Sequence, residues 1–177
     1  MGKGKLAVVG AGPIGLEAAL YARKLGYDVT IFEQGSIAQN MKSWGFVQLF
    51  TPWSMVTTSL GLRTLIDEGE WKSPPRSDCP TGSELVTTYL APLAASRIMH
   101  GCLRDRTTVI AIGRDDFTKV DAIASNERAK SPFRILVRDA IGRELIDRAD
   151  IVIDCSGTYG VHRWAGRGPV TAPGERL

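Results

Sequence analysis

One glycine pattern, Gly10-Ala11-Gly12-Pro13-Ile14-Gly15, constrains this chain more than any other feature. It follows residues 6–9, a short apolar and β-branched run that is typical of a buried parallel strand. After it, apolar residues recur at helical spacing until Gly26, which is a common helix terminator. A G-x-G-x-x-G sequence between a strand and a helix predicts a dinucleotide-binding turn.

Each of the three glycines has a physical reason in such a turn. Gly10 permits the tight bend, Gly12 removes a Cβ where a pyrophosphate approaches the backbone, and Gly15 lets the helix pack close to the strand. The helix N-terminus then offers unpaired N–H groups and a partial positive charge to the phosphates. The alternative is an ordinary strand-to-helix turn without a ligand.

An acidic residue, Glu33, lies at the position where a dinucleotide-binding site requires one. Residues 28–33 read as a second strand, which completes a right-handed βαβ unit and ends at Glu33, 33 − 15 = 18 residues after Gly15. A carboxylate there can accept both hydroxyl protons of an adenosine ribose and would repel a 2′-phosphate. This disfavours NADP at the site and leaves FAD and NAD open; a merely solvated Glu33 is the alternative.

The middle of the chain gives weaker signals. Residues 35–62 mix glycine, serine and proline with several aromatic residues, so we expect this stretch to pack against the fold rather than to be a bare linker. The sequence Thr81-x-x-Glu84 predicts a capping box that opens a helix reaching about Met99. Pro92 is expected to kink or divide that helix.

The second half reads as strands. Residues 107–112 predict a third strand, residues 133–139 and 144–148 predict a hairpin, and residues 150–154 predict a buried strand. The expected fold class is therefore α/β, a Rossmann-like FAD/NAD(P)-binding domain whose parallel sheet carries an inserted β-hairpin or meander before its last strand.

Composition excludes several classes of protein. Hydrophobic residues make up 44% and charged residues 23% of 177 residues, which is ordinary for one packed domain. The net charge of +3 is dispersed, so nucleic acid is not an expected partner, and no apolar run is long enough to cross a membrane. The three cysteines and two histidines have no zinc-like spacing. We expect a cytoplasmic protein with free thiols and no metal.

Three stretches carry a resemblance to a known family. They are residues 8–19 around the glycine pattern, residues 29–33, and residues 149–158, where a strand ends in Cys-Ser-Gly. The chain resembles the FAD-dependent oxidoreductases with two dinucleotide-binding domains, near the flavin monooxygenase-like and pyridine nucleotide oxidoreductase branches. In that family the third stretch ends in Ala-Thr-Gly.

The resemblance implies roles for particular residues. The glycine turn would hold the FAD pyrophosphate, Glu33 the adenosine ribose, and Val109 would lie beside the adenine. An aromatic segment from Trp44 to Trp53 occupies the interval that passes beside the flavin ring in relatives, although aromatic packing under a long loop is the alternative. The candidate cofactor-binding residues are Gly10, Gly12, Pro13, Ile14, Gly15, Glu33, Gln34, Trp44, Val109, Ser156 and Gly157. No catalytic residue is assigned.

The implied function is an FAD-dependent oxidoreductase or the FAD-binding part of one. NAD(P)H would reduce the flavin, and oxygen or a small organic substrate would accept the electrons, as in monooxygenases. The absence of a C-x(4)-C pair after Glu33 disfavours disulfide reduction. Cys155 is expected to be a packed thiol.

The resemblance also implies further parts. Residues 1–160 would form the dinucleotide-binding domain and residues 161–177 a tail or a linker to a second domain, so we expect a homo-oligomer or a completing partner chain. Two other functions stay open. One is a non-catalytic dinucleotide-binding module or accessory subunit. The other is a single-domain NAD-dependent dehydrogenase, which the lack of a Tyr-x-x-x-Lys pair disfavours.

Overall fold

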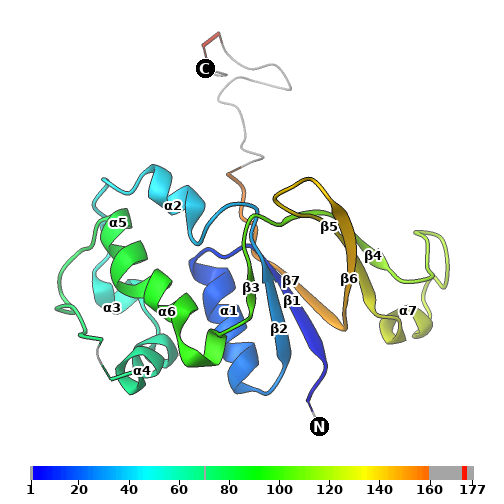
Figure 1. Cartoon of the computed structure of the whole chain (residues 1–177), viewed down its shortest axis with the longest axis horizontal. Helices are drawn as coiled ribbons and strands as arrows, with labels where there is room; N and C mark the ends of the chain where they lie inside the picture. The colour runs from blue at the N-terminus through cyan, green and yellow to red at the C-terminus, as the bar shows by residue number, and fades with distance from the viewer. Residues whose placement is uncertain (1, 70, 160–172, 175–177) are drawn as a thin grey trace.

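The chain folds into three layers in the computed structural model, which describes residues 2–69, 71–159 and 173–174. A parallel four-stranded sheet lies in the middle (Figure 1). Helices cover one of its faces, and a three-stranded antiparallel sheet covers the other. This arrangement confirms the predicted α/β class with a parallel sheet, and the inserted part is a meander of three strands.

The parallel sheet brings the segments that follow three of its strands to one edge. Its order is β3-β2-β1-β7, with bounds β1 Lys5–Val9, β2 Asp28–Phe32, β3 Leu103–Arg104 and β7 Ile151–Asp154. Val9 at the end of β1 is paired with Phe32 on one side and with Asp154 on the other. Because parallel strands end at the same edge, the residues that follow them, Gly10, Glu33 and Cys155, meet there.

Helix α1 (Pro13–Lys24) follows β1 and begins with a proline, whose fixed φ suits the first helical turn. Its apolar face, which includes Leu16 and Leu20, is fully buried against the sheet. The helix ends at Lys24, and Gly26, just beyond the C-cap residue Leu25, has a left-handed φ of +90°. The N–H of Tyr27 donates to the Ala22 carbonyl at 3.1 Å, so glycine closes the helix as the sequence predicted.

The other helices are short. The α-helices are α2 Gln39–Ser43, α3 Trp53–Val56, α4 Ser59–Asp67, α5 Gly82–Leu85, α6 Ala91–Ala95 and α7 Glu127–Lys130, with a π-helical turn Val86–Leu90 and a 3-10 turn Arg97–Met99. The predicted capping box is present, because the Thr81 hydroxyl accepts from the Glu84 N–H at 3.1 Å and the Glu84 carboxylate accepts from the Thr81 N–H at 2.7 Å. The predicted stretch to Met99 is not one helix, since the helical winding stops at Ala95.

Pro92 changes the winding of this helix rather than breaking it. The π-helical turn lies directly before α6, in which Pro92 is the second residue. Proline has no N–H, so it leaves the carbonyl four residues earlier, that of Thr88, without its usual α-helical donor. The indole Nε1 of Trp71 donates to this carbonyl at 2.6 Å. The side chain of Trp71 thus compensates for the proline.

The antiparallel sheet has the order β4-β5-β6, with bounds β4 Thr108–Arg114, β5 Phe133–Arg138 and β6 Glu144–Ala149. The predicted hairpin is β5 and β6, whose turn contains Gly142 at a φ of +84°. Residues 107–112 are not the third strand of the chain. All of them except Thr107 lie in β4, which pairs with β5 in the meander, whereas the third strand is the two-residue β3 in the parallel sheet.

Two apolar cores hold the layers together. The larger lies between the parallel sheet and the helices, and it includes Trp53 from the aromatic stretch that was expected to pack. The smaller lies between the two sheets and is built from Phe32, Ile135 and Val137 with two alanines. No helix among the described residues is both long and apolar enough to cross a membrane. The proposed tail, residues 161–177, falls outside the described residues except for 173–174.

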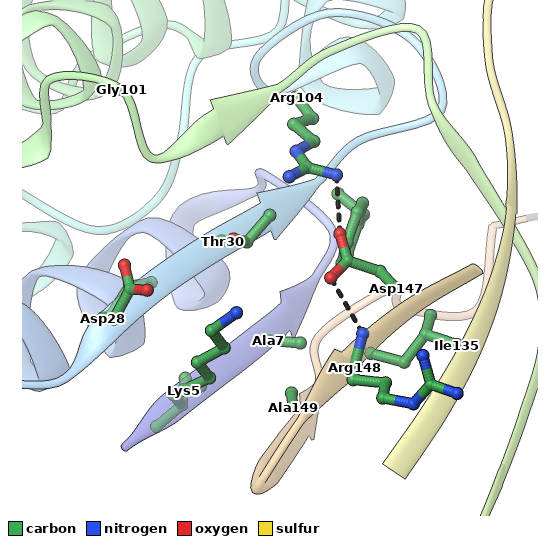
Figure 2. Close-up of a pocket in the computed structure, with 13 residues that line it drawn as sticks. Lys5, Ala7, Asp28, Thr30, Gly101, Arg104, Ile135, Asp147, Arg148 and Ala149 are labelled. Atoms are coloured by element: carbon green, nitrogen blue, oxygen red, sulfur yellow. Dashed lines mark hydrogen bonds and ion pairs between the residues drawn. The ribbon is translucent and has the colours of Figure 1, made fainter. Parts of the chain in front are cut away.

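An ion pair joins the two sheets beside the smaller core (Figure 2). Arg104 Nη1 of β3 donates to Asp147 Oδ2 of β6 at 2.6 Å, and the Arg104 guanidinium lies over the Phe32 ring, 5.6 Å from its centroid. The Asp147 carboxylate also accepts from the backbone N–H of Arg148 at 2.8 Å. These contacts line a polar cavity of about 240 Å³ that does not include the glycine turn.

Candidate dinucleotide site

The bend at Gly10 requires a residue without a side chain. Its φ is +98°, in the left-handed region, and its N–H donates to the Phe32 carbonyl at 2.7 Å. A Cβ at this position would come within 2.7 Å of the Cys155 carbonyl oxygen. Three strand ends therefore crowd the first glycine.

The other two glycines differ sharply in their surroundings. A Cβ at Gly15 would overlap the carbonyl oxygen of Gly10, so the helix could not approach the strand as closely with any other residue. A Cβ at Gly12 would meet no protein atom within 4 Å, and the φ of Gly12 is −79°, which any residue adopts. The fold therefore explains Gly15, whereas the glycine at position 12 leaves space for something other than protein.

The N-terminus of α1 is available to an anion. Gly12 is the N-cap and supplies no side-chain hydrogen bond, and the first turn carries no acidic residue. The first N–H groups of a helix have no intrahelical acceptor and carry the positive end of the helix dipole. This twelve-residue helix thus begins directly after Gly12, where a side chain would meet no protein atom, so an anion has room beside the first turn.

Glu33 is fixed by two backbone groups. Its Oε2 accepts from the Ala11 N–H at 2.8 Å, and its Oε1 accepts from the Gly35 N–H at 2.8 Å. The residue is only 8% exposed. Each carboxylate oxygen has two lone-pair directions, so each keeps one for a further donor. The carboxylate therefore holds the glycine turn and retains acceptors for a ligand.

Two adjoining cavities meet at Glu33. The smaller, of about 120 Å³, is lined by Val9, Gly10, Phe32, Glu33, Gln34, Asn40, Thr107, Thr108, Val109 and Ser156. The larger, of about 280 Å³, is lined by Gly10, Gly12, Pro13, Ile14, Glu33, Ala38, Asn40, Met41, Trp44, Cys155, Ser156, Gly157 and Tyr159. Gly10, Glu33, Asn40 and Ser156 line both, so the cavities form two parts of one site.

The structure brings together the residues that the sequence singled out. Gln34 and Val109 lie in the smaller cavity, and Trp44 and Gly157 lie in the larger one. Gly15 lies beneath the turn and lines neither. Val109 reaches the site from the antiparallel sheet, not from a third parallel strand.

The sequence did not reveal Asn40, which lines both cavities. It lies in α2, and the residue before that helix, Ala38, has a left-handed φ of 53°. The N–H of Ala38 donates to the Ala11 carbonyl at 3.0 Å, which docks α2 on the glycine turn. An alanine gives no signal for such a turn, because this conformation favours glycine and asparagine.

Cys155 lines the larger cavity as a neutral thiol. Burial, and next the charge of Asp154, raise the pKa of the Cys155 thiol. A raised pKa keeps the thiol protonated at neutral pH and disfavours nucleophilic chemistry. The Asp154 carboxylate accepts from the Ser156 hydroxyl at 2.7 Å and from the Ser156 N–H at 3.0 Å, which lowers the pKa of Asp154. Asp154 therefore shapes the turn after β7.

Known structures share this fold. Bacillithiol disulfide reductase from Bacillus cereus has a TM-score of 0.62 at 15% identity, over 85% of this chain and 39% of that chain. The OTEMO complex with FAD and NADP has a TM-score of 0.59 at 17% identity, over 89% of this chain and 26% of that chain. At these identities the likeness establishes the fold.

Sequence comparison gives a short match and a long one. A curated Salmonella typhi protein, the homologue of the NAD-dependent dihydropyrimidine dehydrogenase subunit PreT, is 56% identical over 32 residues, which are 18% of this chain and 8% of that protein. The chain thus spans 39% or less of each protein named here. The longer match covers residues 7–125, from β1 through the glycine turn and Glu33 into the meander, and by it the chain belongs to the family described as pyridine nucleotide-disulphide oxidoreductase.

Proposed function

We propose that this chain binds FAD across the two cavities. The adenine would lie in the smaller cavity beside Gln34 and Val109, and Glu33 would accept hydrogen bonds from the ribose. The pyrophosphate would lie over Gly12 at the N-terminus of α1. The observation that carries the proposal is the contrast between Gly12, where a side chain would meet open space, and the crowded Gly10 and Gly15.

Bound FAD would supply hydride acceptance and electron transfer, with NAD(P)H as donor and oxygen or a small organic molecule as acceptor. The residues of the chain bind and orient the cofactor. The lining of the larger cavity, which includes Met41 and Trp44, is mainly apolar and would exclude water from the ring. Family membership and the FAD and NADP in the OTEMO structure support this assignment.

One observation favours a second candidate, a binding module without catalysis of its own. Of the described residues that line the two cavities, Glu33 is the only charged one, and two backbone N–H groups already hold it. The Cys155 thiol is neutral because burial raises its pKa. The described residues thus provide binding groups at this site and no evident acid or base.

Titration of the purified protein with FAD tests the proposal. We expect saturable binding seen as quenching of tryptophan emission, with a smaller quench in Trp44→Phe because Trp44 lines the cavity. ADP should displace FAD, because it carries the adenosine and pyrophosphate, whereas FMN should not. ADP carrying a 2′-phosphate should compete worse than ADP because of Glu33.

Two results would reject FAD as the ligand. One is the absence of saturable FAD binding, and the other is equal binding of FMN and FAD, because FMN lacks the adenosine. Bleaching of the bound flavin by NADH or NADPH under anaerobic conditions would separate the oxidoreductase from the binding module, which would hold the cofactor without being reduced.

A further inference from the structure

A third cavity adjoins the dinucleotide site on the helical side of the molecule. It is a groove of about 310 Å³, and it shares Pro13, Ile14 and Met41 with the larger cavity. Its lining includes buried residues such as Leu85 of α5 and Leu90 of the π-helical turn. At the rim, Ile14 and Met55 are each 72% exposed. The groove is therefore an open, mainly apolar space beside the proposed cofactor.

Among the described residues, Glu17 of α1 is the one charged residue that lines this apolar groove. Two hydroxyl groups hold its carboxylate: Thr58 Oγ1 donates to Glu17 Oε2 at 2.8 Å, and the Tyr89 hydroxyl donates to Glu17 Oε1. The Thr58 hydroxyl oxygen accepts from the Gly61 N–H at 2.9 Å, so its own proton is directed to Glu17. The orientation of the carboxylate is thus set by Thr58, the N-cap of α4, and by Tyr89 of the π-helical turn.

The Tyr89 hydroxyl stays a donor over a wide pH range. Burial, with a contribution from the hydrogen bond to Glu17, raises the pKa of Tyr89 to about 12. Glu17 forms no ion pair with any Lys, Arg or His among the described residues. Glu17 is only partly buried. Hydroxyl groups compensate the partial desolvation of a carboxylate less completely than a cation does.

From this geometry we propose that the groove binds a primary amine with an apolar body, whose ammonium group pairs with Glu17. The apolar part would lie along Leu49, Met55 and Val56. Each Glu17 oxygen retains a lone pair, because each accepts one hydroxyl hydrogen bond from the protein. The inference rests on the proposed function in one respect, namely that the amine would be the organic substrate beside the FAD.

Amine binding can be measured without turnover. The probes are hexylamine and 1-hexanol, which share the apolar chain and differ in the charge of the polar end. NMR chemical shifts of the FAD-loaded protein would report the affinity of each probe. Charge-assisted hydrogen bonds are about twice as strong as neutral ones, so we expect hexylamine to bind at least about tenfold more tightly than hexanol.

Two variants isolate the carboxylate and the groove. Glu17→Gln should reduce hexylamine affinity to that of hexanol and leave FAD affinity unchanged. Val56→Trp should fill the groove and weaken both probes while Glu17 stays in place. The matched control is Glu144→Gln, a carboxylate in the antiparallel sheet that pairs with Arg138, and this variant should bind both probes as the unaltered protein does.

The outcomes separate this inference from the proposed function. Equal affinity for the two probes, or unchanged hexylamine binding in Glu17→Gln, would overturn the amine site. Binding of hexylamine only to FAD-free protein would overturn it too, since the flavin would then occupy the groove. Failure of FAD to bind, with Glu17-dependent amine binding intact, would instead reject the proposed function and keep the amine site.

Discussion

Replacing Gly12 and Gly15 by alanine, one at a time, should separate ligand binding from folding. At Gly12 the added methyl group meets no protein atom within 4 Å, and the backbone φ of −79° suits alanine. The lower unfolded-state entropy of alanine offsets its weaker N-cap preference, so we expect the free energy of unfolding to change by less than about 1 kcal/mol. The same methyl group occupies the space where the pyrophosphate would lie.

The two substitutions should affect different properties, FAD affinity at position 12 and stability at position 15. A hydrogen bond from an N–H group to a charged oxygen contributes about 1.5–3 kcal/mol. The loss of one such bond to the pyrophosphate in Gly12→Ala should therefore weaken FAD binding by about tenfold to a hundredfold. In Gly15→Ala the methyl group overlaps the Gly10 carbonyl oxygen. This overpacking should cost about 3 kcal/mol. Alanine has a higher helix propensity than glycine by about 1 kcal/mol, so the net destabilisation should be about 2 kcal/mol.

Urea unfolding followed by tryptophan fluorescence measures stability without FAD, and an FAD titration of each folded variant measures affinity. We expect Gly12→Ala to be stable but to bind FAD poorly, and Gly15→Ala to be less stable. If Gly12→Ala bound FAD as tightly as the unaltered protein, the open space above Gly12 would not be the pyrophosphate site. If Gly15→Ala were fully stable, the close approach of α1 to the strand would be wrong.

Three further predictions concern the helical layer. In an ultraviolet titration, Tyr89 should ionise near pH 12, and Tyr89→Phe should remove that late phase. Because the pKa of Tyr89 in the folded protein lies above the ordinary value of 10.0, the contribution of its hydroxyl to stability is complete below pH 10 and is lost as pH rises through about 12. The unfolding curves of the unaltered protein and of Tyr89→Phe should therefore converge above that pH. Trp71→Phe leaves the Thr88 carbonyl without the indole donor and should lower the free energy of unfolding by about 1–3 kcal/mol in urea, and an unchanged midpoint would contradict that role. Thr81→Ala removes the N-cap hydroxyl of α5 and should cost about 1 kcal/mol, whereas Thr81→Ser should restore most of it in the same assay.

The sequence predicts the first βαβ unit well because every signal there is local. Residues 6–9, the glycine pattern and the helical spacing up to Gly26 each act over a few positions, and all are consistent with one structure. The position of Glu33 follows from the same unit. Its hydrogen bonds to Ala11 and Gly35 do not, because they depend on how the turn closes in three dimensions.

The local sequence does not determine which sheet a strand joins. The sequence predicted a strand at residues 107–112, and a strand is there, but its partner is β5 rather than a parallel neighbour. The third parallel strand, Leu103–Arg104, has only two residues and is too short to show a period of two. Periodicity identifies strands, whereas pairing depends on contacts far apart in the sequence.

The passage between the two sheets explains why the smaller cavity lies where it does. After β3 the chain leaves the parallel sheet, and Arg106 adopts a left-handed φ of 46°. Its N–H donates to the Gly35 carbonyl at 3.0 Å, and the Thr107 N–H donates to the Glu33 carbonyl at 2.8 Å. The start of β4 is thus attached to the segment that carries Glu33. Because β3 has only two residues, this attachment follows it at once, and Val109 lines the same cavity as Glu33, where the proposed adenine and ribose contacts lie together.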